Sequence, residues 1–192
     1  MTTFVLATHN AHKVDELRRI LGERLGEHDL VAYDGPDAIE DADTFEGNAL
    51  IKAREAFAHT GLPALADDSG IAVDSLGGAP GIHSARYAGT RDDGDNLRLL
   101  LRNLEGVEDR AAQFVCAAAL VDADGEYVVR GVWPGTVLTA PAGVGGFGYD
   151  PIFRPDGETR SSAELSAAEK DASSHRFLAF RDLVVELRRR HG

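Results

Sequence analysis

Two adjacent carboxylates follow a short apolar run in the first half of the chain. Asp67 and Asp68 come directly after the residues LPALA, and Ser69 and Gly70 complete the sequence DDSG. Adjacent like charges are costly unless a cation neutralises them, and carboxylate oxygens suit Mg²⁺. The stretch therefore predicts a magnesium site. A solvated acidic turn is the alternative, because Asp, Ser and Gly are common turn residues.

The segments around DDSG are expected to present the acids at the end of a strand. Residues 62–66 are typical of a short buried strand, and residues 71–76 indicate a second one. Residues 67–70 are then expected to form the turn between them. Ligands of α/β sheets gather at strand ends, so this is a place for chemistry. The glycine-rich loop 77–81 would allow a close approach to a neighbour or ligand.

A strand, a polar loop and a helix start follow one another at the N-terminus. Residues 3–7 indicate a strand, and apolar residues then recur at helical spacing between positions 14 and 25. Between them, Asn10 can cap the helix and Lys13 adds a positive charge one turn in. Backbone N–H groups at a helix start attract anions, which makes this loop a candidate phosphate site. An ordinary capped helix explains the spacing equally well.

A second helix is predicted over residues 45–60, with Thr44 as its N-cap and Gly61 as its stop. Glu46 in its first turn either complements the helix dipole or faces the acid pair. The acidic loop 34–43 before it is interpreted as a solvated face.

The second half of the chain predicts a mixed sheet. A helix is expected over residues 92–104, with Asp93 or Asp95 near its cap. Strands over 111–121 and 126–132 flank an Asp-Gly step, which is a strong hairpin signal. Trp-Pro-Gly is expected to interrupt the second strand before a further one at 136–139.

An aromatic, glycine-rich segment and a cluster of charges follow. Phe147 and Tyr149 either stack on a nucleotide base or fill the core beneath the loop. A final helix is expected after Ser173 or Ser174, and Lys170, His175 and Arg176 precede or open it. Their charges could therefore face the same cleft as the acid pair.

Composition limits the classes of function. The 192 residues fit one domain, spanning 1–192, and a net charge of −12 argues against nucleic acid as a partner. A small anionic substrate remains compatible, because a local basic cluster outweighs distant screened charges. The one cysteine, Cys116, lies in an apolar run and is interpreted as buried. No signal peptide or membrane-spanning run is evident, so a cytoplasmic protein without a membrane partner is expected.

Four motifs, in order along nearly the whole chain, resemble those of the inosine/xanthosine triphosphate pyrophosphatase family. They are THNAHK at 8–13, LADDSGIAVDSLGGAPGIHSARYAG at 65–89, GGFGYDPIF at 145–153 and AELSAAEKDASSHR at 163–176. The resemblance implies an α/β fold with an elongated central mixed sheet flanked by helices, two lobes with an active-site cleft, and a homodimer. It also implies Mg²⁺-dependent hydrolysis of deaminated purine nucleoside triphosphates (ITP, dITP, XTP) to the monophosphate and pyrophosphate.

The resemblance also assigns roles to residues. It implies that Asp68 is the general base and a metal ligand, and that Ser69 contacts the substrate. The other substrate-binding residues that it implies are Thr8, His9, Asn10, Ala11, His12, Lys13, Phe147, Gly148, Tyr149, Asp150, Lys170, His175 and Arg176.

One position departs from the family pattern. Many relatives carry a metal-binding Glu directly before the Asn-Ala of the second helix, where this chain has Gly47, with Glu46 one residue earlier. A shift of one residue turns a helical side chain by about 100°. The role of Glu46 as a metal ligand is therefore left open.

Three other functions compete with this interpretation. A related pyrophosphatase for modified pyrimidine triphosphates would use the same phosphate chemistry. A non-enzymatic nucleotide sensor would bind the triphosphate without releasing pyrophosphate. A phosphatase of the haloacid dehalogenase type is disfavoured, because its nucleophilic Asp needs a second Asp two positions on, and DDSG lacks one.

Overall fold

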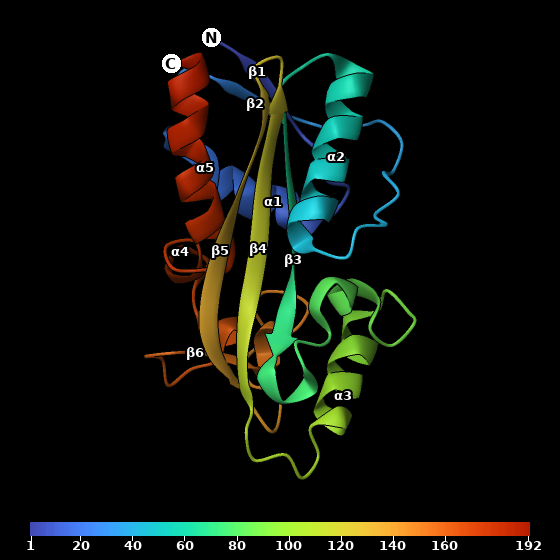
Figure 1. Ribbon diagram of the computed structural model, residues 1–192. Coiled ribbons are helices and arrows are strands. Elements are labelled where there is room, and N and C mark those ends of the chain that lie inside the picture. Colours follow the sequence, from blue (N-terminus) through green and yellow to red (C-terminus); the bar gives the residue numbers. More distant parts are fainter. The chain divides into compact units, whose positions relative to one another are not determined.

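The computed structural model describes residues 1–192, apart from the side chain of Glu23. In this described part of the chain, six strands form one sheet in the order β2-β1-β3-β4-β5-β6 (Figure 1). The strands are β1 Thr3–Leu6, β2 Asp29–Ala32, β3 Ala64–Val73, β4 Ala111–Asp122, β5 Gly125–Val137 and β6 Phe153–Pro155. The helices of the α type are α1 Ala11–Leu21, α2 Phe45–Thr60, α3 Asp93–Asn103, α4 Ala167–Lys170 and α5 His175–His191.

The sheet is mixed, as predicted. Strand β1 pairs in parallel with both β2 and β3, whereas β5 and β6 are antiparallel. Helices accompany the strands along the chain, which confirms the α/β class. Among the described residues, no helix has the length and apolar character needed to cross a membrane.

The chain divides into two compact units, and its path passes from one to the other inside β3, β4 and β5 and again between Ser174 and His175. Unit 1 consists of Met1–Asp68, Cys116–Gly131 and His175–Gly192. Unit 2 consists of Ser69–Val115 and Val132–Ser174.

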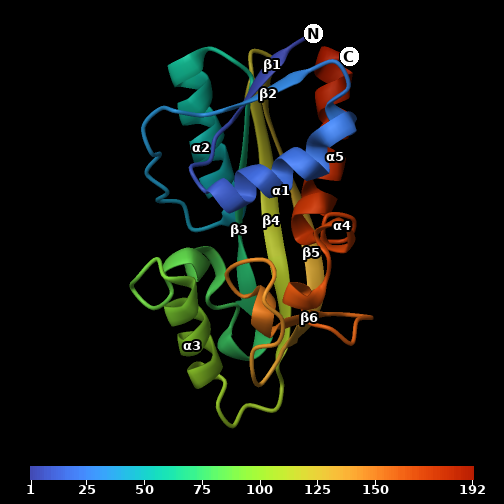
Figure 2. The same cartoon turned by 180° about the vertical axis from the view of Figure 1, so that it is seen from behind.

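The core of unit 1 lies between its strands and the helices α1 and α5. Figure 2 shows α1 crossing the strands beside α5, and Leu17 of α1 and Phe180 of α5 are fully buried in one apolar cluster with Phe4 of β1. Cys116 of β4 belongs to the same cluster, and burial raises the pKa of its thiol. The helical spacing of apolar residues after β1 therefore did identify a core-facing helix.

The capping residues of unit 1 were predicted correctly. The Asn10 side chain accepts a hydrogen bond from the Lys13 backbone N–H, and Thr44 accepts one from Gly47. Helix α2 ends at Gly61, whose φ of 69° is the left-handed conformation that glycine adopts easily. Local hydrogen bonding was enough to define these helix ends.

The core of unit 2 is built around aromatic rings. The ring centroids of Phe114 and Phe153 lie 4.4 Å apart, and those of Trp133 and Phe153 lie 5.7 Å apart. Helix α3 adds the fully buried Leu100 to this cluster. Its N-cap is Asp92, and the expected candidates Asp93 and Asp95 lie in the first turn.

The turn predicted at DDSG is wrong, because β3 runs without a break from Ala64 to Val73. Gly70 serves close packing instead of a turn: a Cβ at this position would collide with Ser84 Oγ and with the carbonyl oxygen of Gly81. Ser84 Oγ in turn accepts a hydrogen bond from the Ile71 backbone N–H at 2.9 Å. The glycine therefore lets a neighbouring segment rest on the strand.

The interruption predicted in β5 is also wrong. The strand continues through Trp133, Pro134 and Gly135 to Val137. A Cβ at Gly135 would collide with the carbonyl oxygen of Arg154 in β6, so the small residue admits the neighbouring strand. Pro134 is exposed, and its carbonyl accepts a hydrogen bond from Asp156 at 3.0 Å.

Candidate active site

The continuous strand separates the two acids of DDSG. Successive side chains of a strand point to opposite faces of the sheet. Asp67 accordingly contacts Lys13 of α1, and Asp68 contacts Asn48 of α2. The two carboxylates are therefore placed in different surroundings, although the sequence makes them neighbours.

Asp67 is the centre of a buried ionic cluster in unit 1. Its side chain has no exposed surface, and its Oδ2 lies 2.9 Å from Lys13 Nζ and 3.5 Å from Arg176 Nε. Burial alone would raise the pKa of this carboxyl, but Lys13, Arg176 and Lys52 hold it well below its usual range. The neighbouring cations therefore favour the ionised form of Asp67, and its carboxylate fixes the positions of Lys13 and Arg176.

Glu16 completes this cluster and was missed by the sequence interpretation. Its Oε2 accepts a hydrogen bond from Arg176 Nη1 at 3.1 Å, and both side chains are buried. The available signal was its position three residues after Lys13, which places the two on one face of α1 beside the apolar Leu17 and Ile20. Arg176 is thus held between an acid of α1 and an acid of β3.

Asp68 belongs to a second group on the other face of the strand. Asn48 Nδ2 donates to Asp68 Oδ2 at 3.3 Å, and Lys52 Nζ lies 3.5 Å from Asp68 Oδ1. The same ammonium lies 3.0 Å from Glu40 Oε2. Burial raises the pKa of Asp68, with Lys52 and Lys13 opposing this effect. A carboxyl with a raised pKa is a better proton acceptor than an ordinary aspartate.

Lys52, which lies between the carboxylates of Asp68 and Glu40, also has a shifted pKa. Burial alone would lower the pKa of Lys52, but Asp68, Asp67 and Glu40 raise it above its ordinary value. Lys52 therefore stays protonated, and it marks the place where Asp68 and Glu40 attract positive charge.

Asn48, Lys52 and Glu40 were not predicted as site residues. Asn48 and Lys52 are four residues apart and so share one face of α2, which is a detectable signal. Glu40 gave no such signal, because it lies within the acidic loop that was interpreted as solvated.

Glu40 is better placed than Glu46 to assist Asp68 in binding a metal. Glu46 Oε1 lies 3.4 Å from Arg130 Nη1, with which it forms an ion pair. Among the described side chains, no three His, Cys, Asp or Glu residues converge as a complete metal site. Two carboxylates facing one cation nevertheless fit Mg²⁺, which commonly takes one or two protein carboxylates together with water and phosphate oxygens.

The loop before α1 has the form expected of an anion site. Asn10 N donates to Thr8 Oγ1 at 3.3 Å, and the residues His9 to His12 are exposed at the N-terminus of an 11-residue helix. His9 Nδ1 lies 2.6 Å from Asp37 Oδ1 in the acidic loop. The exposed start of this helix is suited to phosphate oxygens, because the helix dipole places partial positive charge there.

Phe147 and Tyr149 were predicted either to stack on a base or to fill the core, and the structure places the two rings differently. Tyr149 is buried in the core, and its hydroxyl donates to the Ser84 carbonyl at 2.7 Å, so it fills the core beneath the loop. Phe147 is half-buried, and Lys170 Nζ lies 5.1 Å from the centre of its ring. Gly148 N donates to Asp93 Oδ2 at 2.8 Å. Phe147 is therefore the less buried of the two rings.

The predicted site residues thus gather in separate groups within the units that contain them. In unit 1, Lys13, Asp67 and Arg176 meet directly, and His175 next to Arg176 is buried. In unit 2, Asp150 and Lys170 form a buried ion pair. Ser69 continues β3 directly after Asp68.

Comparison with known proteins identifies close relatives along nearly the whole chain. The model of the Ham1 family matches residues 4–186. A dITP/XTP pyrophosphatase of Streptomyces coelicolor is 55% identical over 196 residues, covering 98% of this chain and 98% of its own. A dITP/XTP pyrophosphatase of Mycobacterium tuberculosis is 50% identical over 98% of this chain and 96% of its own.

Solved structures of similar proteins share the fold. A Ham1 protein from Coxiella burnetii superimposes with a TM-score of 0.89 at 40% identity, over 98% of this chain and all of that one. A dITP/XTP pyrophosphatase from Mycobacterium abscessus has a TM-score of 0.76 at 46% identity, over 94% of this chain and 98% of its own.

Proposed function

Because the chain belongs to the Ham1 family, we propose that it hydrolyses the triphosphates of deaminated purine nucleosides (ITP, dITP and XTP) to the monophosphate and pyrophosphate. It is a nucleoside triphosphate pyrophosphatase, like its relatives in Streptomyces and Leifsonia, which are named dITP/XTP pyrophosphatases. The observation that carries the proposal is the pairing of a buried, raised-pKa Asp68 with Glu40 around one cation. The hydrolysis of an anhydride needs such a base beside a charge-stabilising group.

The residues of unit 1 suggest a division of labour. Asp68 accepts a proton from the water that attacks the α-phosphorus, and the bond to the bridging oxygen breaks so that pyrophosphate leaves. The helix start at Thr8 to Lys13 holds phosphate oxygens at the positive end of the helix dipole. Asp68 and Glu40 would hold Mg²⁺, which when bound supplies charge neutralisation for the phosphates. Asp67, Glu16 and Arg176 keep the position of Lys13 fixed.

The remaining assignments are supported by the resemblance of the motifs. We propose that Phe147 stacks on the base, that Lys170 and His175 contact the substrate, and that the protein acts in the cytoplasm as a homodimer. The net charge of −12 supports a small-molecule substrate over a nucleic acid.

The substrate is tested by release of pyrophosphate from a panel of nucleotides. With Mg²⁺, we expect specificity constants for ITP, dITP and XTP at least about 100-fold above those for ATP and GTP, because buried polar groups matched to one base are left unpaired by another. Faster hydrolysis of dTTP or UTP would favour a pyrimidine enzyme. Binding of ITP with no pyrophosphate over hours would identify a sensor.

The identity of the second metal-binding carboxylate is tested by replacing Glu40 and Glu46 separately with Gln. Glu40→Gln is expected to raise the Mg²⁺ concentration for half-maximal ITP hydrolysis at least about tenfold, because even the loss of a partner of a metal ligand costs about this much affinity, and Glu40 is proposed to hold the ion itself. Glu46→Gln, which removes only the ion pair with Arg130, is expected to leave it unchanged. The reverse result would assign the ligand to Glu46.

A further inference from the structure

Both oxygens of the Asp150 carboxylate are hydrogen-bonded by partners inside unit 2. Its Oδ2 accepts hydrogen bonds from the Phe147 backbone N–H at 2.9 Å and from Lys170 Nζ at 2.5 Å. Its Oδ1 accepts one from Ser162 Oγ at 2.9 Å, and the residue is only 2% exposed. Three donors from separate segments thus meet at one buried charge, which is a strong local constraint.

The loop around this carboxylate is shaped to fit it. Gly146 has a φ of 69°, and a Cβ at this position would collide with Asp150 Oδ2. The backbone of the loop therefore closes directly onto the acid, and only glycine fits there. Phe147 follows Gly146 directly. The direction of its ring therefore depends on the hydrogen bond that the Phe147 backbone N–H donates to Asp150.

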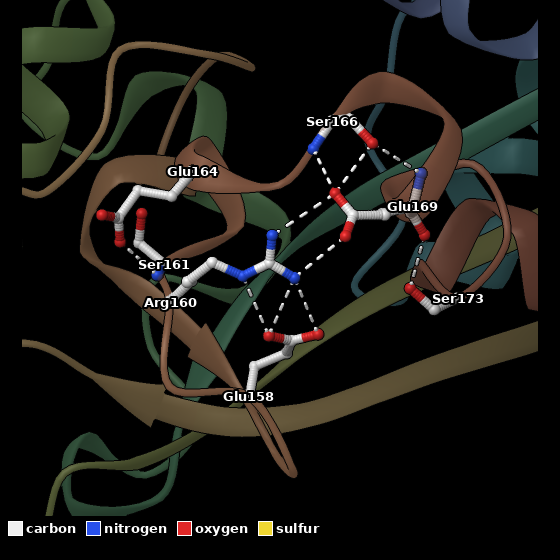
Figure 3. Close-up of polar contacts among 7 residues, drawn as sticks. All are labelled: Glu158, Arg160, Ser161, Glu164, Ser166, Glu169 and Ser173. Atoms are coloured by element: carbon white, nitrogen blue, oxygen red, sulfur yellow. Dashed lines mark hydrogen bonds and ion pairs between the residues drawn. The ribbon is translucent and has the colours of Figure 1, made fainter.

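A second polar network holds Glu169, the residue before Lys170 (Figure 3). Arg160 Nη2 lies 3.0 Å from Glu169 Oε1 and 3.2 Å from Glu158 Oε2. Glu169 also accepts from the Ser166 backbone N–H at 2.8 Å in a capping box that begins α4. Lys170 follows Glu169 directly, and its backbone N–H donates to the Ser166 carbonyl at 3.0 Å, while its ammonium is held by Asp150 over the Phe147 ring.

We propose that Asp150 is a positioning residue, which orients Phe147 and Lys170 for the base side of the substrate without contacting the substrate itself. The inference rests on the proposed function and refines the role that the motif resemblance gives to Asp150. A carboxylate that is occupied on both oxygens would have to give up a buried charged contact to bind a ligand, and that exchange is costly. Its effect is therefore exerted through the two side chains that it holds.

The test compares Asp150→Asn and Ser162→Ala with the control Ser173→Ala. Ser173 Oγ donates to the Glu169 carbonyl and lies outside the carboxylate cluster, so this variant matches Ser162→Ala in chemistry. Two readouts are measured: amide hydrogen exchange of residues 143–149, and KM and kcat for ITP. The exchange readout requires no activity, so it tests the positioning role even if the protein does not hydrolyse ITP.

For Asp150→Asn we expect exchange at Phe147 to be faster by about tenfold or more, the scale of one lost charge-assisted hydrogen bond. We expect KM for ITP to rise about tenfold and kcat to change less than about threefold, as for a loss of uniform binding. Ser162→Ala should move both readouts in the same direction by less, and Ser173→Ala should move neither.

Two results would overturn the proposal. A raised KM with unchanged exchange across residues 143–149 would mean that Asp150 contacts the substrate directly. Unchanged exchange and unchanged KM in Asp150→Asn would mean that the loop does not depend on it. If Asp150→Asn does not fold, Ser162→Ala decides the matter alone, and its agreement with Ser173→Ala would refute the positioning role.

Discussion

Replacing Asp68 by Asn is expected to lower the turnover of ITP by at least about 100-fold, the usual scale for loss of a general base. The amide keeps the shape of the side chain and its contact with Asn48, but it removes the charge beside Lys52 and the site that accepts the proton. Initial rates of pyrophosphate release at saturating Mg²⁺ measure the effect.

Two further variants make this result specific. Asp74→Asn, at an exposed position six residues later in the chain, is expected to retain full turnover. Asp67→Asn is expected to lose less than Asp68→Asn, because Asp67 fixes cations and does not face Asn48 and Lys52. A variant Asp68→Asn with near-normal turnover would assign the base to another residue.

Replacing Lys13 by Met is expected to lower the free energy of unfolding by about 3 kcal/mol, the lower end for breaking a buried ion pair. The reason is that Asp67 has no exposed surface and loses its nearest cation, at 2.9 Å. Urea unfolding at pH 7 measures the change. The double variant Lys13→Met with Asp67→Asn is expected to be more stable than Lys13→Met alone, since the buried charge that has lost its nearest cation is gone.

The pH dependence of this difference has a definite sign. The folded pKa of Asp67 lies below its unfolded value of about 4, so the ion pair contributes stability above that pH and less as the pH falls. The difference in free energy of unfolding between the unmodified protein and Lys13→Met should therefore become smaller below about pH 4.

A double variant less stable than Lys13→Met would mean that Lys13 stabilises the protein through packing and not through its charge.

Local signals in the sequence were sufficient for the helices but not for the acid pair. Asn10, Thr44 and Gly61 act within a few residues, so their roles were readable from spacing alone. In the sequence, Asp67 was interpreted as one half of an acid pair with Asp68. Its partner in the structure, Lys13, lies 54 residues away in the chain, so no local signal links the two. Only the pairing of distant segments makes a buried charge at that position tolerable.

The same distinction explains Glu40. An acid within a run of acids is ordinarily solvated, and neither its neighbours nor its spacing set Glu40 apart from Asp37 or Asp41. Its contact with Lys52 depends on the path of the loop, which spacing does not encode. Tyr149 and Phe147 were equivalent in the sequence for the same reason, and only packing distinguished the buried ring from the half-buried one.

The surroundings of Cys116 have a practical consequence for labelling. The thiol is completely buried in the core of unit 1 and its pKa is raised, and the reactive species in alkylation is the thiolate. Maleimide reagents should therefore leave the folded protein unmodified, and a cysteine introduced at the fully exposed Val144 would be the single reactive thiol. A fluorophore attached there would report on the loop of residues 143–149, because no other thiol of the folded protein would be labelled.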